Sequence, residues 1–150
     1  MSAAFFRANA GLCVTDGRGS VLAVRRRGDV EHPWQMPQGG IKAHETPLEA
    51  AWRELEEETG LGPANTRLLD SYPEWLVYEL PPAWRSARVG WGQAQRWFLL
   101  ETSPHVPVRV DGRELDAWTW MRPAELLGET APFRRPVYAR IFRRFVGFGG

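Results

Sequence analysis

The chain has 150 residues, of which 43% are hydrophobic and 25% are charged, and its formal net charge at pH 7 is +1. This length predicts one domain, 1–150, with an ordinary globular core, and the small net charge excludes a polycation that binds nucleic acid indiscriminately. No apolar run reaches the roughly 18 residues of a membrane helix, so we expect no membrane partner. Cys13 has no second cysteine to pair with, which favours a reducing compartment and a cytoplasmic location.

The first part of the chain predicts an antiparallel hairpin followed by irregular structure. Alternating apolar residues favour strands at 9–15 and 20–26, joined by the turn 15–19. Residues 28–33 are expected to form a loop. In the next stretch, 34–40, one proline and two glycines argue against regular structure and allow a backbone to approach a ligand closely.

Residues 47–59 carry the clearest helix signal. Thr46 is a good N-cap and Pro47 suits the first turn. Glu49 completes a capping box with Thr46, and Gly60 supplies the left-handed stop. The sequence therefore predicts one helix with both ends defined.

Strands and helices are mixed in the second half of the chain. Runs of strand-forming residues occupy 67–80 and 93–101, and a short strand is expected at 117–121. Pro123 begins a brief helix, and 137–146 is typical of a final amphipathic helix. This mixture predicts an α/β domain with a mixed sheet between helices.

The 47–59 helix places three carboxylates beside its buried face. On a helical wheel the apolar stripe consists of Leu48, Ala51, Trp52 and Leu55. Glu54, Glu57 and Glu58 share the neighbouring arc, where like charges disfavour the helix by roughly 0.2–0.5 kcal/mol per pair. A divalent cation would remove this penalty, because Mg²⁺ takes hard oxygen ligands. A solvated acidic face is the alternative for the helix considered alone.

The spacing of the acidic residues extends beyond the helix. Five residues separate Gly39 from Glu45, and seven more lead to the run 53–61, which reads Arg-Glu-Leu-Glu-Glu-Glu-Thr-Gly-Leu. This pattern resembles the signature of the Nudix hydrolases. The resemblance implies a Nudix-type α/β/α sandwich with a central mixed sheet and a catalytic loop-helix-loop. It also implies metal-dependent cleavage of a pyrophosphate linkage in a nucleoside 5′-polyphosphate, with Mg²⁺, or with Mn²⁺ or another divalent cation in its place.

The resemblance also assigns roles to particular residues. The implied metal ligands are Gly39, through its carbonyl, and Glu54, Glu57, Glu58 and Glu114. These glutamates and Arg53 form the implied catalytic set, although the identity of the general base stays open. On the wheel Arg53 lies beside Glu49 and Glu57, so it can hold the acidic cluster in place. Glu45 is interpreted as structural support, and an ordinary surface position is the alternative for Glu114.

Further stretches resemble the bacterial RNA pyrophosphohydrolases and dinucleoside polyphosphate hydrolases. These stretches are 6–11, 34–40, 92–98, 114–118 and 133–138. The resemblance implies an RNA 5′ end or a dinucleoside polyphosphate as substrate, and we favour removal of pyrophosphate from triphosphorylated RNA. The non-enzyme alternative is a Nudix-fold nucleotide- or RNA-binding module, which we would expect to lack one or more of the metal carboxylates. No stable protein partner is expected, so the chain is predicted to be a monomer or weak dimer.

Several residues outside the signature are candidates for substrate binding. Arg25 and Arg26 end the second predicted strand and can offer guanidinium groups to a polyphosphate. The resemblance adds Arg7, Gln38, Phe133 and Val137 to the substrate-binding set. Plain core packing is the alternative for Phe133 and Val137, and surface charge is the alternative for Arg25. The arginines of the last helix, Arg140, Arg143 and Arg144, are interpreted mainly as a solvated face, with guidance of RNA toward the cleft as the alternative.

Overall fold

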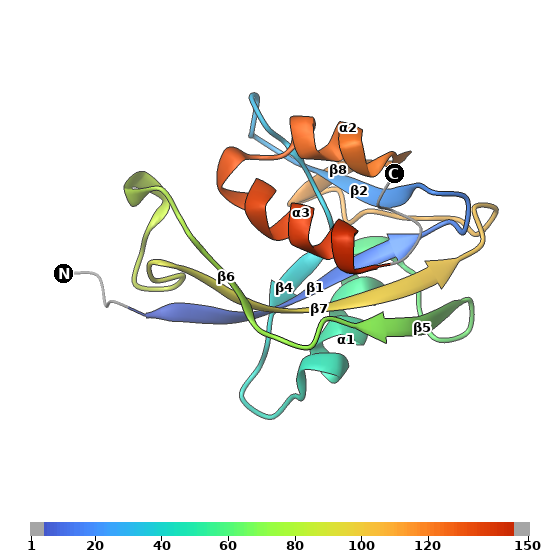
Figure 1. Ribbon diagram of the computed structural model, residues 1–150, viewed down its shortest axis with the longest axis horizontal. Coiled ribbons are helices and arrows are strands. Elements are labelled where there is room, and N and C mark those ends of the chain that lie inside the picture. The colour runs from blue at the N-terminus through green and yellow to red at the C-terminus, as the bar shows by residue number, and fades with distance from the viewer. Residues whose placement is uncertain (1–4, 146–150) are drawn as a thin grey trace.

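Helices cover both faces of one mixed sheet in the computed structural model, which describes residues 5–145 (Figure 1). The strands are β1 (Phe6–Thr15), β2 (Val21–Arg26), β3 (Trp34–Gln35), β4 (Gln38–Gly40), β5 (Thr66–Ser71), β6 (Leu76–Glu79), β7 (Gly92–Thr102) and β8 (Leu115–Met121). The helices are α1 (Pro47–Thr59), α2 (Pro123–Glu129) and α3 (Arg135–Arg144), with 3-10 turns η1 (Pro82–Trp84) and η2 (Pro132–Arg134). This arrangement confirms the expected α/β/α sandwich.

The long strands β1 and β7 form the centre of the sheet. They run parallel from the pair Phe6 and Gly92 to the pair Thr15 and Glu101. The main path of the sheet is β3-β2-β1-β7-β5, and the other strands add to it in antiparallel pairs, with β4 on β1, β6 on β7 and β8 on β2. The parallel pair makes the sheet mixed, as the sequence predicts.

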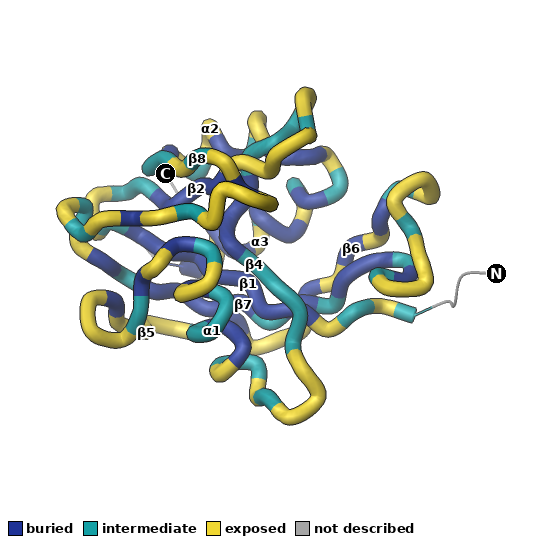
Figure 2. Tube along the Cα trace, turned by 180° about the vertical axis from the view of Figure 1, so that it is seen from behind, coloured by how far each residue is buried: buried dark blue, intermediate teal, exposed yellow. Residues whose placement is uncertain are grey.

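Alternation along the central strands separates two hydrophobic cores. In β1, Leu12 and Val14 pack in the core that contains Leu55 of α1, whereas Cys13 packs in the core that contains Ile141 of α3. The side chains of β2 and β7 alternate between the same two cores, because successive residues of a strand point to opposite faces of the sheet. Figure 2 shows the resulting buried centre beneath exposed loops. Cys13 is free, as expected of a lone cysteine, and it is buried, which raises the pKa of its thiol.

Helix α1 has the bounds and caps that the sequence predicts. The Thr46 hydroxyl accepts from the Glu49 amide at 3.1 Å, and the Glu49 carboxylate accepts from the Thr46 amide at 2.9 Å. Gly60 adopts φ 76°, a left-handed conformation that glycine reaches without steric cost. The capping box and the left-handed Gly60 therefore fix both ends of the helix, independently of the carboxylates on its face.

The structure corrects the expectation of irregular backbone at 34–40. The segment forms β3 and β4, which pair with β2 and β1 respectively. The strands are separated at Pro37, which has no amide to donate, although its carbonyl accepts from the Leu12 amide at 2.9 Å. Glycines in β4 then permit the close approach of neighbouring side chains.

Other element boundaries also differ from those predicted. The single run at 67–80 divides into β5 and β6, and Pro73, which cannot donate to a sheet, lies between them. Strand β1 begins at Phe6, three residues earlier than expected, and α3 begins at Arg135 instead of Val137. Val146, the predicted end of the last helix, lies outside the described residues. Within 5–145, no helix is long and apolar enough to span a membrane.

Candidate active site

Most of the predicted site residues line one open cavity of about 610 Å³. It contains the predicted residues Arg7, Arg26, Gln38, Gly39, Glu54, Glu57, Glu58 and Glu114. We call this the carboxylate cavity. Strands β1, β2 and β4, helix α1 and the residues before β8 all contribute to it, so the fold brings together groups that are far apart in the sequence.

The contact between β4 and α1 depends on a missing side chain. A Cβ atom built at Gly39 would overlap the carboxylate of Glu54, and one built at Gly40 would overlap the guanidinium of Arg7. The two glycines therefore let an acidic and a basic side chain lie directly against the backbone. The pattern of glycines and glutamates in the sequence reflects this close packing.

Arg53 connects the acidic residues around the cavity. Its guanidinium donates to Glu45 at 2.5 and 2.8 Å, to Glu54 at 2.7 Å, to Glu57 at 3.2 Å and to the carbonyl of Gly40 at 2.8 Å. The forked geometry of arginine suits this number of acceptors. Arg53 consequently holds α1 against the loop that precedes it and against the end of β4.

The structure gives Arg53 a different set of carboxylate partners from the set that the helical wheel predicts. The Glu49 carboxylate accepts from the Thr46 amide in the capping box, and the ion pairs of Arg53 are with Glu45, Glu54 and, as expected, Glu57. Glu45 replaces Glu49 as the principal carboxylate, eight residues before Arg53. A wheel considers only neighbours within the helix, so it could not identify a partner that precedes the N-cap.

Two of the helix carboxylates carry an electrostatic penalty. Burial raises the pKa of Glu54 despite the hydrogen bond from Arg53. Burial also raises the pKa of Glu58 well above its ordinary value, and the nearby charge of Glu54 adds to this, while the Gln38 amide, which donates at 3.2 Å, opposes it. Buried like charges of this kind are stabilised by a cation.

The donor set therefore fits a divalent metal ion. Four carboxylates and the backbone of Gly39 face the cavity, and oxygen ligands are those that Mg²⁺ and Mn²⁺ prefer. Among residues 5–145, however, no three acidic, histidine or cysteine side chains are placed so that they could hold a metal ion by themselves. Mg²⁺ keeps several water ligands and needs only one or two protein carboxylates with substrate phosphates.

The pairing of Glu45 predicts a specific acid sensitivity. Hydrogen bonds from Arg53, and then from the Lys42 amide, lower the pKa of Glu45 from 4.5 to about 2. The folded state therefore binds this proton less tightly than the unfolded state, so the stabilisation is complete above pH 4.5 and is lost as the pH falls toward 2. Urea unfolding across this range should show a steeper loss for the wild type than for Glu45→Gln, and parallel curves would contradict the assignment.

Basic side chains line the carboxylate cavity together with the carboxylates. Arg7 and Arg26 were predicted there, but Arg27, Arg88 and Arg113 also line the cavity. The sequence could have indicated Arg113 as a cavity residue, because it directly precedes Glu114, a predicted metal ligand. Arg88 has no such signal in the sequence, because it reaches the cavity through the loop between β6 and β7, which is joined to the start of β1 by a bridge between Gly90 and Phe6.

Three predicted substrate-binding residues have other surroundings. Arg25 lies outside the carboxylate cavity and forms an ion pair with Asp116 at 2.7 Å. Successive side chains of a strand point to opposite faces of the sheet, so Arg25 and Arg26 take different directions, and the pairing with β8 is irregular at this point. Val137 is buried in the core beneath α3, as its alternative interpretation expected, and Phe133 lines a neighbouring cavity.

The neighbouring cavity, of about 730 Å³, shares Arg26 and Arg27 with the carboxylate cavity. Its lining also contains the aromatic rings of Trp84 and Phe133 and the acidic residues Asp29 and Glu31. We call it the aromatic cavity. The rings of Trp84 and Phe133 lie 5.4 Å apart at 76°, and the guanidinium of Arg26 lies 5.9 Å from the ring of Trp84. Trp84 is 42% exposed, so its ring is open to a ligand. Aromatic rings beside a guanidinium are suited to stacking with a nucleobase.

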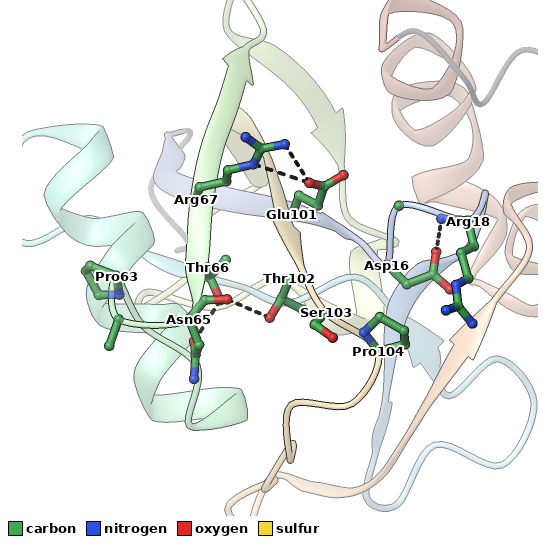
Figure 3. A pocket seen from close by; sticks show the side chains of 12 residues that line it. Asp16, Arg18, Pro63, Asn65, Thr66, Arg67, Glu101, Thr102, Ser103 and Pro104 are labelled. Atoms are coloured by element: carbon green, nitrogen blue, oxygen red, sulfur yellow. Dashed lines mark hydrogen bonds and ion pairs between the residues drawn. The ribbon is translucent and has the colours of Figure 1, made fainter.

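A third cavity, of about 620 Å³, lies away from these groups (Figure 3). Its polar side chains largely satisfy one another, since Arg67 pairs with Glu101 at 2.8 Å and the Thr102 hydroxyl donates to the Asn65 carbonyl at 2.9 Å. It contains none of the predicted site residues. The carboxylate cavity is therefore the candidate active site.

Residues 5–141 match the NUDIX domain, and the chain belongs to the Nudix family. It is a Nudix hydrolase, a family whose members generally use divalent metal ions. Among proteins of similar sequence, the RNA pyrophosphohydrolase of Halorhodospira halophila (strain DSM 244 / SL1) is 43% identical over 150 residues, which cover 95% of this chain and 81% of that protein. The RNA pyrophosphohydrolase of Marinomonas sp. (strain MWYL1) is 39% identical over 148 residues, covering 94% and 91%.

Solved structures of low sequence identity share the fold. The Escherichia coli dihydroneopterin triphosphate pyrophosphohydrolase superposes with a TM-score of 0.75 at 20% identity, covering 90% of this chain and 95% of that one. A binary complex of the Caenorhabditis elegans Ap4A hydrolase gives a TM-score of 0.72 at 19% identity, covering 95% and 99%. These likenesses confirm the fold class.

Proposed function

We propose that the protein removes pyrophosphate from the triphosphorylated 5′ end of RNA in a reaction that depends on Mg²⁺. The observation that carries this proposal is the junction of two cavities at Arg26, one rich in carboxylates and the other aromatic. A polyphosphate with bound metal ions suits the first cavity, and an adjacent nucleobase suits the second. The names of the two bacterial relatives support the same substrate.

The chemistry follows from the residues of the carboxylate cavity. Glu54, Glu57, Glu58 and Glu114, with the carbonyl of Gly39, would hold the metal. A bound divalent ion supplies charge neutralisation of adjacent phosphates and lowers the pKa of a coordinated water. One of the carboxylates accepts the proton of the attacking water, and Glu57, Glu58 and Glu114 remain the candidates for this base. Arg53 positions the acidic side chains, and Arg7 and Arg26 bind phosphate oxygens.

Hydrolysis of a dinucleoside polyphosphate such as diadenosine tetraphosphate is the second candidate. Both substrates carry a run of phosphates on the 5′ oxygen of a nucleoside; the run is terminal in triphosphorylated RNA and ends in a second nucleoside in the dinucleotide. Trp84 and Phe133 could stack with adenine in either case. The deciding experiment compares both substrates with purified protein in Mg²⁺, with Mn²⁺ as a second metal and Glu57→Gln as the inactive control. More efficient release of pyrophosphate from RNA supports the proposal. ATP formed mainly from the dinucleotide, or equal inactivity on both, overturns it.

Trp84 is expected to contribute to nucleotide binding. Stacking of a base on an aromatic ring contributes about 1–3 kcal/mol, so Trp84→Ala should raise the KM for RNA by roughly 5- to 160-fold with little change in kcat. Steady-state kinetics on triphosphorylated RNA would measure this change. Trp118→Ala is the matched control, because Trp118 is similarly exposed, at 36%, but lies on β8 outside both cavities. An equal effect of the two substitutions would contradict a role for Trp84 in stacking.

Domain organisation, oligomeric state and cellular location complete the proposal. We continue to predict a single Nudix domain over 1–150, a monomer or weak dimer without a stable protein partner, and a cytoplasmic location. Size-exclusion chromatography with light scattering tests the expected mass directly.

A further inference from the structure

The exposed side of α3 carries three arginine side chains in one row. Arg140, Arg143 and Arg144 are exposed, whereas Tyr138 and Ile141 face the core on the opposite side. Spacings of three and four residues place the arginines on the same face of the helix. We call these three residues the α3 arginine row.

The α3 arginine row has no acidic partner among residues 5–145. Elsewhere in the described part of the chain Arg25, Arg53 and Arg67 each pair with a carboxylate, but none of the row's guanidinium groups takes part in an ion pair or hydrogen bond. Like charges at this spacing disfavour a helix by roughly 0.2–0.5 kcal/mol per pair. The helix dipole offsets part of this cost in the last turn. An anionic ligand would offset the rest.

A shallow cavity lies beside the row. It measures about 280 Å³ and is lined by the three arginines and by Tyr72, a largely buried residue between β5 and β6. A positively charged groove is the feature that follows the backbone of single-stranded nucleic acid without reading its sequence, and Tyr72, 8% exposed, contributes little ring surface for stacking. The cavity therefore fits a phosphate group of a polynucleotide chain.

The position of α3 connects the row to the candidate active site. Pro132 and Phe133 line the aromatic cavity, and α3 begins at Arg135, immediately beyond them. Pro136, Arg140 and Arg144 are exposed and follow one another at four-residue intervals, so the exposed face leads along the helix away from the cavity. With a rise of 1.5 Å per residue, the distance along the axis from the start of α3 to its end is about 14 Å. This length suits a few nucleotides of RNA.

We propose that the α3 arginine row binds backbone phosphates of the RNA nucleotides that follow the 5′ end held in the cavities. The inference rests on the proposed function and extends it. A dinucleoside polyphosphate has no polynucleotide chain to reach the row. The row therefore favours RNA over small nucleotides without taking part in the chemical step.

The test compares two triple variants that change the net charge equally. One is Arg140→Gln/Arg143→Gln/Arg144→Gln, and the control is Arg18→Gln/Arg109→Gln/Arg122→Gln, which removes three exposed arginines of other elements. Each is assayed on a triphosphorylated single-stranded oligonucleotide, a triphosphorylated dinucleotide and diadenosine tetraphosphate. The row variant should lose about tenfold in kcat/KM on the oligonucleotide alone, and its log–log salt slope should flatten by about 2, at ~0.7 per phosphate contact. Equal losses on all three substrates, or none, would overturn the proposal.

A binding measurement separates the row from the catalytic assignment. Fluorescence anisotropy of a labelled, unphosphorylated single-stranded RNA without metal gives a Kd that does not depend on hydrolysis. A weaker Kd for the row variant supports the row as an RNA site even if the wild type releases no pyrophosphate from RNA, an outcome that would reject only the proposed function. An unchanged Kd for the row variant, together with a circular dichroism melt like that of the wild type, rejects the RNA-binding role of the α3 arginine row.

Discussion

Glu58→Gln is expected to abolish most of the activity and, without metal, to stabilise the fold. The carboxylate would lose its capacity as a metal ligand or base, so kcat should fall by about 10²–10⁴-fold, the range for loss of a general base. The same substitution should increase the stability of the folded state in the absence of metal. Burial and the charge of Glu54 raise the pKa of Glu58, so the ionised carboxylate destabilises the folded state at neutral pH. A neutral amide removes that charge and keeps an oxygen to accept from the Gln38 amide.

Thermal melts with and without Mg²⁺ measure this reversal. The folded state binds the Glu58 proton more tightly than the unfolded state, so the wild type should lose stability as the pH rises through and above 4.5, while Glu58→Gln should not. Added Mg²⁺ should raise the Tm of the wild type more than that of the variant. Glu56→Gln is the matched control on the same helix, because Glu56 is exposed. A variant that keeps a large part of its activity, or melts below the wild type without metal, would show that Glu58 is not a metal-linked carboxylate.

Gly39→Ala should inactivate the enzyme through a single methyl group. The added Cβ would overlap the carboxylate of Glu54, so this side chain or strand β4 must move. A displacement of the order of 1 Å at a catalytic group can cost roughly 100-fold in rate. We therefore expect kcat/KM to fall by about two orders of magnitude or more, together with weaker Mg²⁺ binding, measured by calorimetry.

The control for Gly39→Ala is Gly62→Ala. Gly62 has no atom within 4 Å of a built Cβ and does not have a positive φ, so its substitution should leave both activity and metal affinity near wild type. Far-ultraviolet circular dichroism distinguishes a local displacement from general unfolding. Wild-type metal affinity in Gly39→Ala would contradict the close packing of Glu54 against β4.

Local features of the chain were predictable because they depend on neighbouring residues. The limits of α1 follow from Thr46, Glu49 and Gly60, whose hydrogen bonds and left-handed stop are short-range. The shared arc of Glu54, Glu57 and Glu58 follows from the helical repeat alone. The prediction at 34–40 failed, because pairing with β1 and β2 outweighed the local preference of proline and glycine for irregular backbone.

The sequence by itself determined the helix, its caps, its line of carboxylates and, through the spacing of Gly39 and Glu45, its resemblance to the Nudix hydrolases. Only the tertiary structure decided which distant groups share the cavity. The pairing of β2 with β8 places Arg25 beside Asp116 while Arg26 lines the cavity, and the loop between β6 and β7 brings Arg88 to the same cavity. The physical reason is range: a helix is stabilised by contacts three and four residues apart, whereas strand register and loop placement depend on contacts across the whole chain.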